Sequence, residues 1–207
     1  CAGLADRLVE KIKLKRNKEQ KFKQTQGMYV ACGSLNKITE KQVEYAQKNG
    51  GFERIHLTME QKLIPEYYKT AAGKHFMESV VALCREKKKV IVDTFDQDDT
   101  KEEFLKLHQI PKESVRFRIS DSHGCIVDEI VSQKTDVTIL MTGGDTLMGY
   151  MKKIGCTQIE PLCEIEQGVV VSSIVSGGRS VQVISKSGGF GTEDILCRIA
   201  EKVIKKA

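Results

Sequence analysis

One stretch of the sequence decides the fold, residues 137–146, which read VTILMTGGDT. The apolar and β-branched residues 137–141 predict a short buried strand, and the residues after Thr146 predict a helix as far as Lys153. A buried strand that enters a helix through a glycine turn is typical of a parallel sheet covered by helices. We therefore expect an α/β protein.

The same alternation of short apolar strands and longer helices extends on both sides of this stretch. Further strands are predicted at 28–32, 54–57 and 90–94, and further helices at 3–13, 37–48, 65–87, from 101, at 120–133 and at 192–206. Residues 168–175 and 180–186 predict an antiparallel hairpin, with Gly177-Gly178 as its turn. The predicted architecture has three layers: a mostly parallel sheet, helices on both faces and a C-terminal β-hairpin, in a single domain over residues 1–207.

Composition and charge exclude several classes of protein. The 207 residues are 40% apolar and 29% charged, with a net charge of +5, which is ordinary for a globular domain that buries a core. No run of about 18 apolar residues is present, so we expect no membrane partner. The lysine-rich runs contain a single aromatic residue, Phe22, so we expect no nucleic-acid partner. The chain has no signal peptide and begins in mid-helix, so we expect it to be part of a longer protein.

The seven cysteines indicate the redox environment of the protein. None of them forms a C-x-x-C pair, so a zinc site is not expected. An odd, unpatterned set of cysteines favours reduced thiols, and we therefore expect a cytoplasmic protein.

Three predicted strand ends carry glycine or small polar residues, at Gly33-Ser34, Gly143–Thr146 and Ser187–Gly191. In open α/β sheets, ligands bind beyond the carboxyl ends of the strands. Glycine lets the backbone approach a phosphate there, and the next helix begins with unpaired N–H groups and a partial positive charge. One such turn is commonly only a turn, whereas two in one domain favour a phosphate site. The chain has no P-loop motif and no G-x-G-x-x-G after the first strand, which argues against those two nucleotide-binding classes.

Single polar residues near these junctions keep more than one interpretation. Thr146 could reach a phosphate with its hydroxyl, and Asp145 could orient the loop, accept from a ribose hydroxyl or hold Mg²⁺ through water. Lys186 could pair with a phosphate or face water. Asp93 could line the same cleft, and His123 is more commonly structural than catalytic. The sequence assigns no catalytic base and no set of metal ligands.

The order of the three glycine junctions resembles the C-terminal nucleotide-binding domain of the four-carbon acid sugar kinases, which include the 3-oxo-tetronate, threonate and erythronate kinases. The resemblance covers nearly the whole chain, and its most specific parts are Gly143–Thr146 and residues 186–191, KSGGFG. It implies ATP-dependent phosphorylation of a hydroxyl on a four-carbon sugar acid, with Mg²⁺. The ATP contacts that it implies are Ser34, Gly143, Gly144, Asp145, Thr146 and Gly188.

Two residues depart from the family pattern, and one part of the family is not matched. Asn36 stands where a second serine is frequent, and Asp145 replaces a frequent glutamate, which keeps the carboxylate but shortens its reach. Family members begin with an N-terminal domain that carries an Asp-Asp-rich segment near a Thr-Gly-Ala turn, and nothing in this sequence matches it. The resemblance implies that this absent domain holds the sugar acid and the catalytic carboxylate. We therefore expect the present chain to bind ATP and to turn over poorly by itself.

Three functional hypotheses remain open from the sequence. The first is the ATP-binding domain of a sugar-acid kinase. The second is a non-catalytic regulatory domain that binds a nucleotide or a sugar phosphate. The third is an isomerase or aldolase-like enzyme that uses the glycine loops for a substrate phosphate. The sequence leaves a homodimer open and does not indicate which sugar acid is used.

Overall fold

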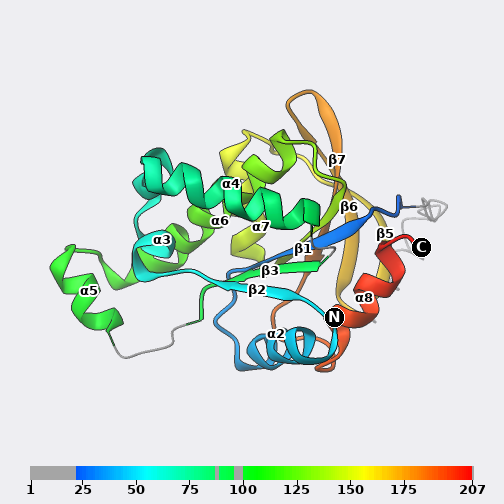
Figure 1. The fold of residues 1–207 in the computed structure, drawn as a ribbon, viewed down its shortest axis with the longest axis horizontal. Helices are drawn as coiled ribbons and strands as arrows, with labels where there is room; N and C mark the ends of the chain where they lie inside the picture. Colours follow the sequence, from blue (N-terminus) through cyan, green and yellow to red (C-terminus); the bar gives the residue numbers. More distant parts are fainter. Residues whose placement is uncertain (1–21, 87–88, 96–99, 207) are drawn as a thin grey trace, which may run out of the picture.

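The computed structural model describes residues 22–86, 89–95 and 100–206, and the helix predicted at 3–13 lies outside these ranges. In the described part no helix is both long and apolar enough to cross a membrane. Seven strands form one sheet in the order β2-β3-β1-β4-β7-β6-β5, and the first five in that order run parallel (Figure 1). The strands are β1 (Gly27–Cys32), β2 (Glu53–His56), β3 (Lys89–Asp93), β4 (Val137–Thr142), β5 (Glu160–Glu166), β6 (Val169–Ser176) and β7 (Arg179–Lys186).

Helices cover both faces of this sheet, as Figure 1 shows. One face packs against α2 (Lys37–Asn49) and α8 (Ile195–Val203). The other face packs against α4 (Ala71–Glu86), α6 (Val115–Ser132) and α7 (Gly144–Lys153). The structure therefore confirms the predicted three-layer α/β architecture.

The central strand β1 shows why the two faces form two cores. All six of its residues are buried. Met28 and Val30 lie in the core beneath α2 and α8, whereas Tyr29 and Ala31 lie in the core beneath α4, α6 and α7. A strand buried on both faces needs apolar residues throughout, and this explains its continuous apolar run.

The C-terminal hairpin forms as predicted, and it completes the main sheet. β6 and β7 are antiparallel, and Gly177 and Gly178 at their turn have φ values of 55° and 73°, as a two-residue type I′ turn requires. β7 also pairs in parallel with β4. The sequence analysis missed β5, which pairs with β6 at the edge of the sheet. Its charged residues and Pro161 conceal the strand, although both are common on edge strands.

The long helix predicted from Pro65 to Lys87 is wrong in its first part. Residues Pro65–Lys69 form a separate 3₁₀ turn, η1, and α4 begins only at Ala71. Thr70 between them is extended, with ψ of 164°, and its hydroxyl accepts a hydrogen bond from the Gly73 amide at 3.0 Å. A threonine that caps the next helix in this way ends the preceding turn.

Three short elements gather at the carboxyl edge of the sheet: α3 (Met59–Leu63), α5 (Lys101–Leu107) and η2 (Lys112–Ser114). Together with the start of α6 they build a third apolar cluster. Its buried members are Leu63, Leu105, Ile110, Val115 and Ile119. The sequence analysis missed α3, which begins with a capping box between Thr58 and Gln61. These elements form a wall beside the loops that follow the parallel strands.

Candidate functional site

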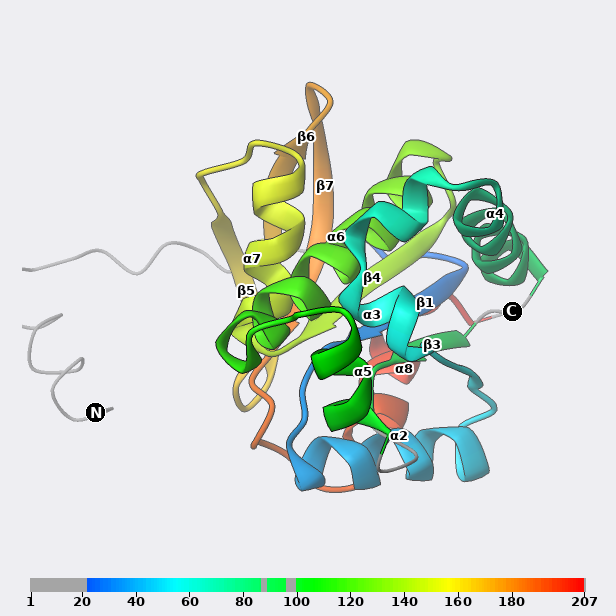
Figure 2. The ribbon, with the colours of Figure 1, turned by 90° about the vertical axis from the view of Figure 1, so that its left-hand side faces the viewer.

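The three glycine junctions come together at the carboxyl edge of the sheet. β1, β4 and β7 are consecutive neighbours in the sheet, so the loops after them emerge side by side, as Figure 2 shows from that edge. A Cβ added to Gly33 would lie 2.5 Å from Thr146 Oγ1, and one added to Gly188 would lie 2.8 Å from Ser34 Oγ. Both glycines are thus needed for close approach, and they bring all six predicted contact residues into one site.

The loop between β7 and α8 is fixed by side chains from α2. Thr39 Oγ1 donates a hydrogen bond to the Gly188 carbonyl at 2.5 Å. Gln42 Nε2 donates to the carbonyls of Phe190 and Gly191 at 3.0 and 2.9 Å. Because α2 also follows the Gly33-Ser34 loop, it holds two of the three loops in fixed relation. This preorganises the backbone before any ligand arrives.

The third loop leads from β4 into α7. Gly143 has φ of 87° and ψ of 141°, a region that favours glycine, and its amide donates to the Lys186 carbonyl at 2.9 Å. A Cβ on Gly144 would meet no protein atom within 4 Å, so the first turn of α7 faces open space. The unpaired N–H groups of this turn are suited to bind an anion.

Asp145 and Thr146 differ in their accessibility. The Asp145 side chain is exposed, while its carbonyl accepts a short hydrogen bond from Ser120 Oγ. The Thr146 hydroxyl is buried and donates to the Thr142 carbonyl at 2.9 Å. Thr146 therefore packs the loop against Gly33 with its hydroxyl already engaged, and the Asp145 carboxylate stays available for a ligand.

A row of polar side chains crosses the sheet beneath these loops. His56, Asp93, Cys32, Thr142 and Lys186 are register partners on five neighbouring strands. Side chains in register on parallel strands lie on the same face, so this row lies on the face covered by α2 and α8. Sequence reasoning could not find it, because the five residues lie far apart in the chain.

Asp93 lies near the β2 end of this row and has a structural role. Its carboxylate accepts from Arg54 Nε at 2.6 Å and from the Phe95 amide at 3.2 Å, and His56 Nδ1 lies 2.6 Å from it at an angle unsuited to a hydrogen bond. A buried carboxylate with these partners links β2 to β3. Its side chain is directed to β2, away from the glycine loops.

His123 is buried in α6, and its Cδ2 would lie 3.2 Å from a Cβ on Gly33. Neither ring nitrogen has a hydrogen-bond partner in the described part of the chain. Burial lowers the pKa of His123 to about 4, so the ring is neutral near pH 7. A neutral ring beneath the loop serves packing, in agreement with the structural interpretation from the sequence.

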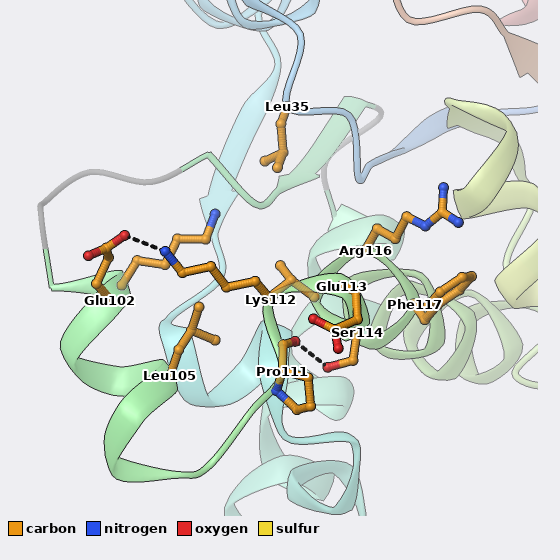
Figure 3. A pocket seen from close by; sticks show the side chains of 11 residues that line it. Leu35, Glu102, Leu105, Pro111, Lys112, Glu113, Ser114, Arg116 and Phe117 are labelled. Atoms are coloured by element: carbon orange, nitrogen blue, oxygen red, sulfur yellow. Dashed lines mark hydrogen bonds and ion pairs between the residues drawn. The ribbon is translucent and has the colours of Figure 1, made fainter.

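A cavity of about 800 Å³ lies next to the loops. Figure 3 shows Leu35, from the loop after β1, facing α5, η2 and the start of α6 across it. Apolar side chains such as Val115 and Phe117 share its lining with Lys112, which pairs with Glu102 at 2.7 Å. The sequence did not predict this cavity, because it forms only where four elements meet.

These features define an α/β domain in which three glycine loops meet at the carboxyl edge of the sheet. The family profile described as "nucleotide-binding C-terminal domain" matches residues 29–196, and the chain belongs to that family. No protein of curated function is significantly similar to it in sequence.

Solved structures share the fold at low sequence identity. A Bordetella bronchiseptica protein with a domain of unknown function (DUF1537), solved as a domain-swapped dimer with bound citrate, is 16% identical with a TM-score of 0.64. A Haemophilus influenzae protein of the same family is 22% identical, also with a TM-score of 0.64. The matches cover 89% and 92% of this chain but only 43% of each of those chains. The chain therefore spans less than half the length of these relatives.

Proposed function

We propose that the three glycine loops bind the phosphate chain of ATP, and that the domain serves a kinase acting on a hydroxyl of a four-carbon sugar acid. The observation that carries this proposal is the convergence of the loops, in which Gly33 contacts Thr146 and Gly188 contacts Ser34. Phosphoryl transfer depends mostly on positioning and charge stabilisation, and a rigid, glycine-lined edge with helix N–H groups supplies both.

A few residues are proposed to contact the nucleotide, each in a different way. Gly144 and Gly189 leave space for a ligand, since a Cβ on the first would meet nothing within 4 Å and one on the second only Asn36 Nδ2 at 3.7 Å. The first-turn amides of α7 would bind phosphate oxygens, and Ser34 Oγ would donate a further hydrogen bond. These residues bind and orient the nucleotide, and none of them removes a proton from the acceptor.

The Asp145 carboxylate fits the needs of Mg²⁺ in such a site. Mg²⁺ keeps several waters and is commonly held by one or two carboxylates together with substrate phosphates. Asp145 is exposed at the first turn of α7, beside the proposed phosphate position. Within the described ranges no group of three or more histidine, cysteine or acidic residues could hold a metal alone. A bound Mg²⁺ would supply charge neutralisation on the phosphates.

The sugar acid and the catalytic base are proposed to lie on a further domain, absent from this sequence. Large apolar side chains are exposed on the elements around the site, which supports a second surface covering this edge. They are Leu35, Ile38, Phe117, Met148 and Phe190. Citrate, found in the Bordetella protein, is a hydroxy acid and thus agrees with an acceptor of this type. Because the Bordetella protein was solved as a domain-swapped dimer, we also propose a homodimer. The free cysteines of the described part support a cytoplasmic location.

Calorimetric titration of the folded chain with MgATP and with a non-hydrolysable analogue tests the nucleotide site. We expect saturable binding of both, and folded protein that shows no heat at millimolar nucleotide would refute the proposal. A comparison with sugar phosphates separates the kinase from the isomerase or aldolase hypothesis, since the latter predicts that sugar phosphates bind better. Phosphorylation of a four-carbon sugar acid by the chain joined to its N-terminal domain would then exclude a purely regulatory role.

A further inference from the structure

Lys186 is a buried cation at the edge where the glycine loops meet. Its side chain is 1% exposed, and Nζ donates a hydrogen bond to the carbonyl of Ser187, the next residue in the chain, at 2.9 Å. That contact places the ammonium directly under the loop between β7 and α8. An ammonium has three N–H donors, and this is the single hydrogen bond it makes to the described residues.

No carboxylate of the described residues pairs with this ammonium. The ion pairs of the described residues include none to Lys186 Nζ, and two acidic groups at the ends of β5 and α8 pair with other cations. Glu166 pairs with Arg198 and Lys202, and Asp194 pairs with Arg198. An uncompensated buried charge is costly, so a residue of this kind indicates that an anion from outside completes the site.

A second group at the same place lacks a partner. Thr142 is the register partner of Lys186 on the neighbouring strand and immediately precedes Gly143. It is fully buried, and its Oγ1 makes no hydrogen bond in the part of the chain that the structure describes. The Cys32 thiol lies beside it: burial raises the thiol pKa to about 12, and the interaction with the Thr142 side chain offsets part of that rise. The Thr142 hydroxyl and the Lys186 ammonium are therefore two neighbouring donors suited to bind one negatively charged ligand.

We infer that the Lys186 ammonium and the Thr142 hydroxyl lie at the bottom of the phosphate site and bind a phosphate oxygen of the nucleotide. This inference rests on the proposed function, and it adds the group that recognises phosphate charge. The six contacts implied by family resemblance contain no cation. Lys186 supplies one at the strand end between the loops that approach the phosphates, where a charge-assisted hydrogen bond is strongest.

The charge state of Lys186 makes this binding sensitive to pH. Burial lowers the pKa of Lys186 to about 8, and the neighbouring Cys32 thiol acts weakly in the other direction. On the covering helices Thr39 and Gln42 face the loop, and neither of them titrates. A bound phosphate restores the charged form, so nucleotide binding near pH 9 takes up most of one proton per site, and binding near pH 7 takes up much less at this residue.

The experiment compares wild type with Lys186→Met, Thr142→Val and Lys205→Met by calorimetry with MgATP, MgADP and adenosine. Repetition in buffers of different ionisation enthalpy gives the proton uptake. We expect Lys186→Met to weaken ATP and ADP binding about 10- to 100-fold, to leave adenosine binding unchanged and to abolish proton uptake at pH 9. Thr142→Val should weaken binding several-fold and keep the uptake. Lys205→Met removes the same charge from an exposed site and should change neither quantity.

The outcomes separate this inference from the proposed function. Wild-type protein that binds no nucleotide overturns both. Wild-type protein that binds ATP while Lys186→Met binds it equally well, with the same proton uptake, overturns this inference alone. Lys186→Met is matched in length and removes an uncompensated charge, so we expect its melting temperature to equal or exceed that of wild type. A large decrease would show a structural role and would also overturn the inference.

Discussion

Replacement of Gly144 by alanine should separate stability from function at the proposed site. Gly144 is the first residue of α7, its φ is not positive, and an added Cβ meets no protein atom within 4 Å. The side chain would therefore project into the space where we place a phosphate. A substitution that leaves the protein stable but weakens ligand binding identifies a residue of the binding surface.

Gly144→Ala should raise the stability of the fold and lower the affinity for ATP. A glycine-to-alanine change at a compatible helical position raises the free energy of unfolding by about 0.4–1 kcal/mol, which raises Tm by about 1–4 °C for a chain of this length. Loss of one backbone hydrogen bond to a charged phosphate costs about 1.5–3 kcal/mol, equivalent to about 10- to 150-fold in Kd. Gly33→Ala gives the contrast, because its Cβ would lie 2.5 Å from Thr146 Oγ1 and should destabilise by about 1–3 kcal/mol.

The assay pairs thermal unfolding with MgATP calorimetry on the same preparations. Lys153→Ala, exposed in the last turn of α7, controls for helix propensity and should bind ATP as wild type does. ATP affinity that is unchanged in Gly144→Ala would refute the placement of the phosphate at this turn. Instability of Gly144→Ala would refute the open geometry at Gly144 instead.

Two further predictions concern buried polar groups. Asp93→Asn should lower the free energy of unfolding by about 2–3 kcal/mol in urea titrations, since it removes the partner of partly buried Arg54; Glu102→Gln, in the exposed pair with Lys112, should have no measurable effect, and equal effects of the two changes would contradict this. His123 has a folded pKa of about 4, below its unfolded value of about 6.5, so the unfolded state binds more protons between these values and stability is lost as pH falls from 6.5 towards 4. The stability lost through this residue is on the order of 3 kcal/mol. This loss should be absent in His123→Asn. Identical pH dependence of unfolding in wild type and His123→Asn would disprove the prediction.

Local patterns determined the elements that depend on local physics. The run 137–146 predicted β4 and the start of α7 because its apolar residues end at Gly143, and the structure confirms both elements, with Gly143 at φ of 87°. The break at Thr70 escaped the same reasoning, since a hydrophobic period continues through it and only the side-chain cap interrupts the helix. The edge strand β5 was missed because it contains three glutamates and Pro161 and has no continuous apolar run like those of the central strands.

For the site, the sequence alone placed glycine loops at the ends of three strands and predicted that these loops bind phosphate; the structure confirms the positions of the loops, and phosphate binding stays a prediction. The tertiary structure alone decided that β1, β4 and β7 are neighbours, so that Gly33 reaches Thr146 and Gly188 reaches Ser34. It also decided that Lys186 is buried and has no carboxylate partner among the residues that the structure describes. Strand order and burial depend on how distant apolar faces pack together, and a local pattern carries no information about which distant residue will be its neighbour.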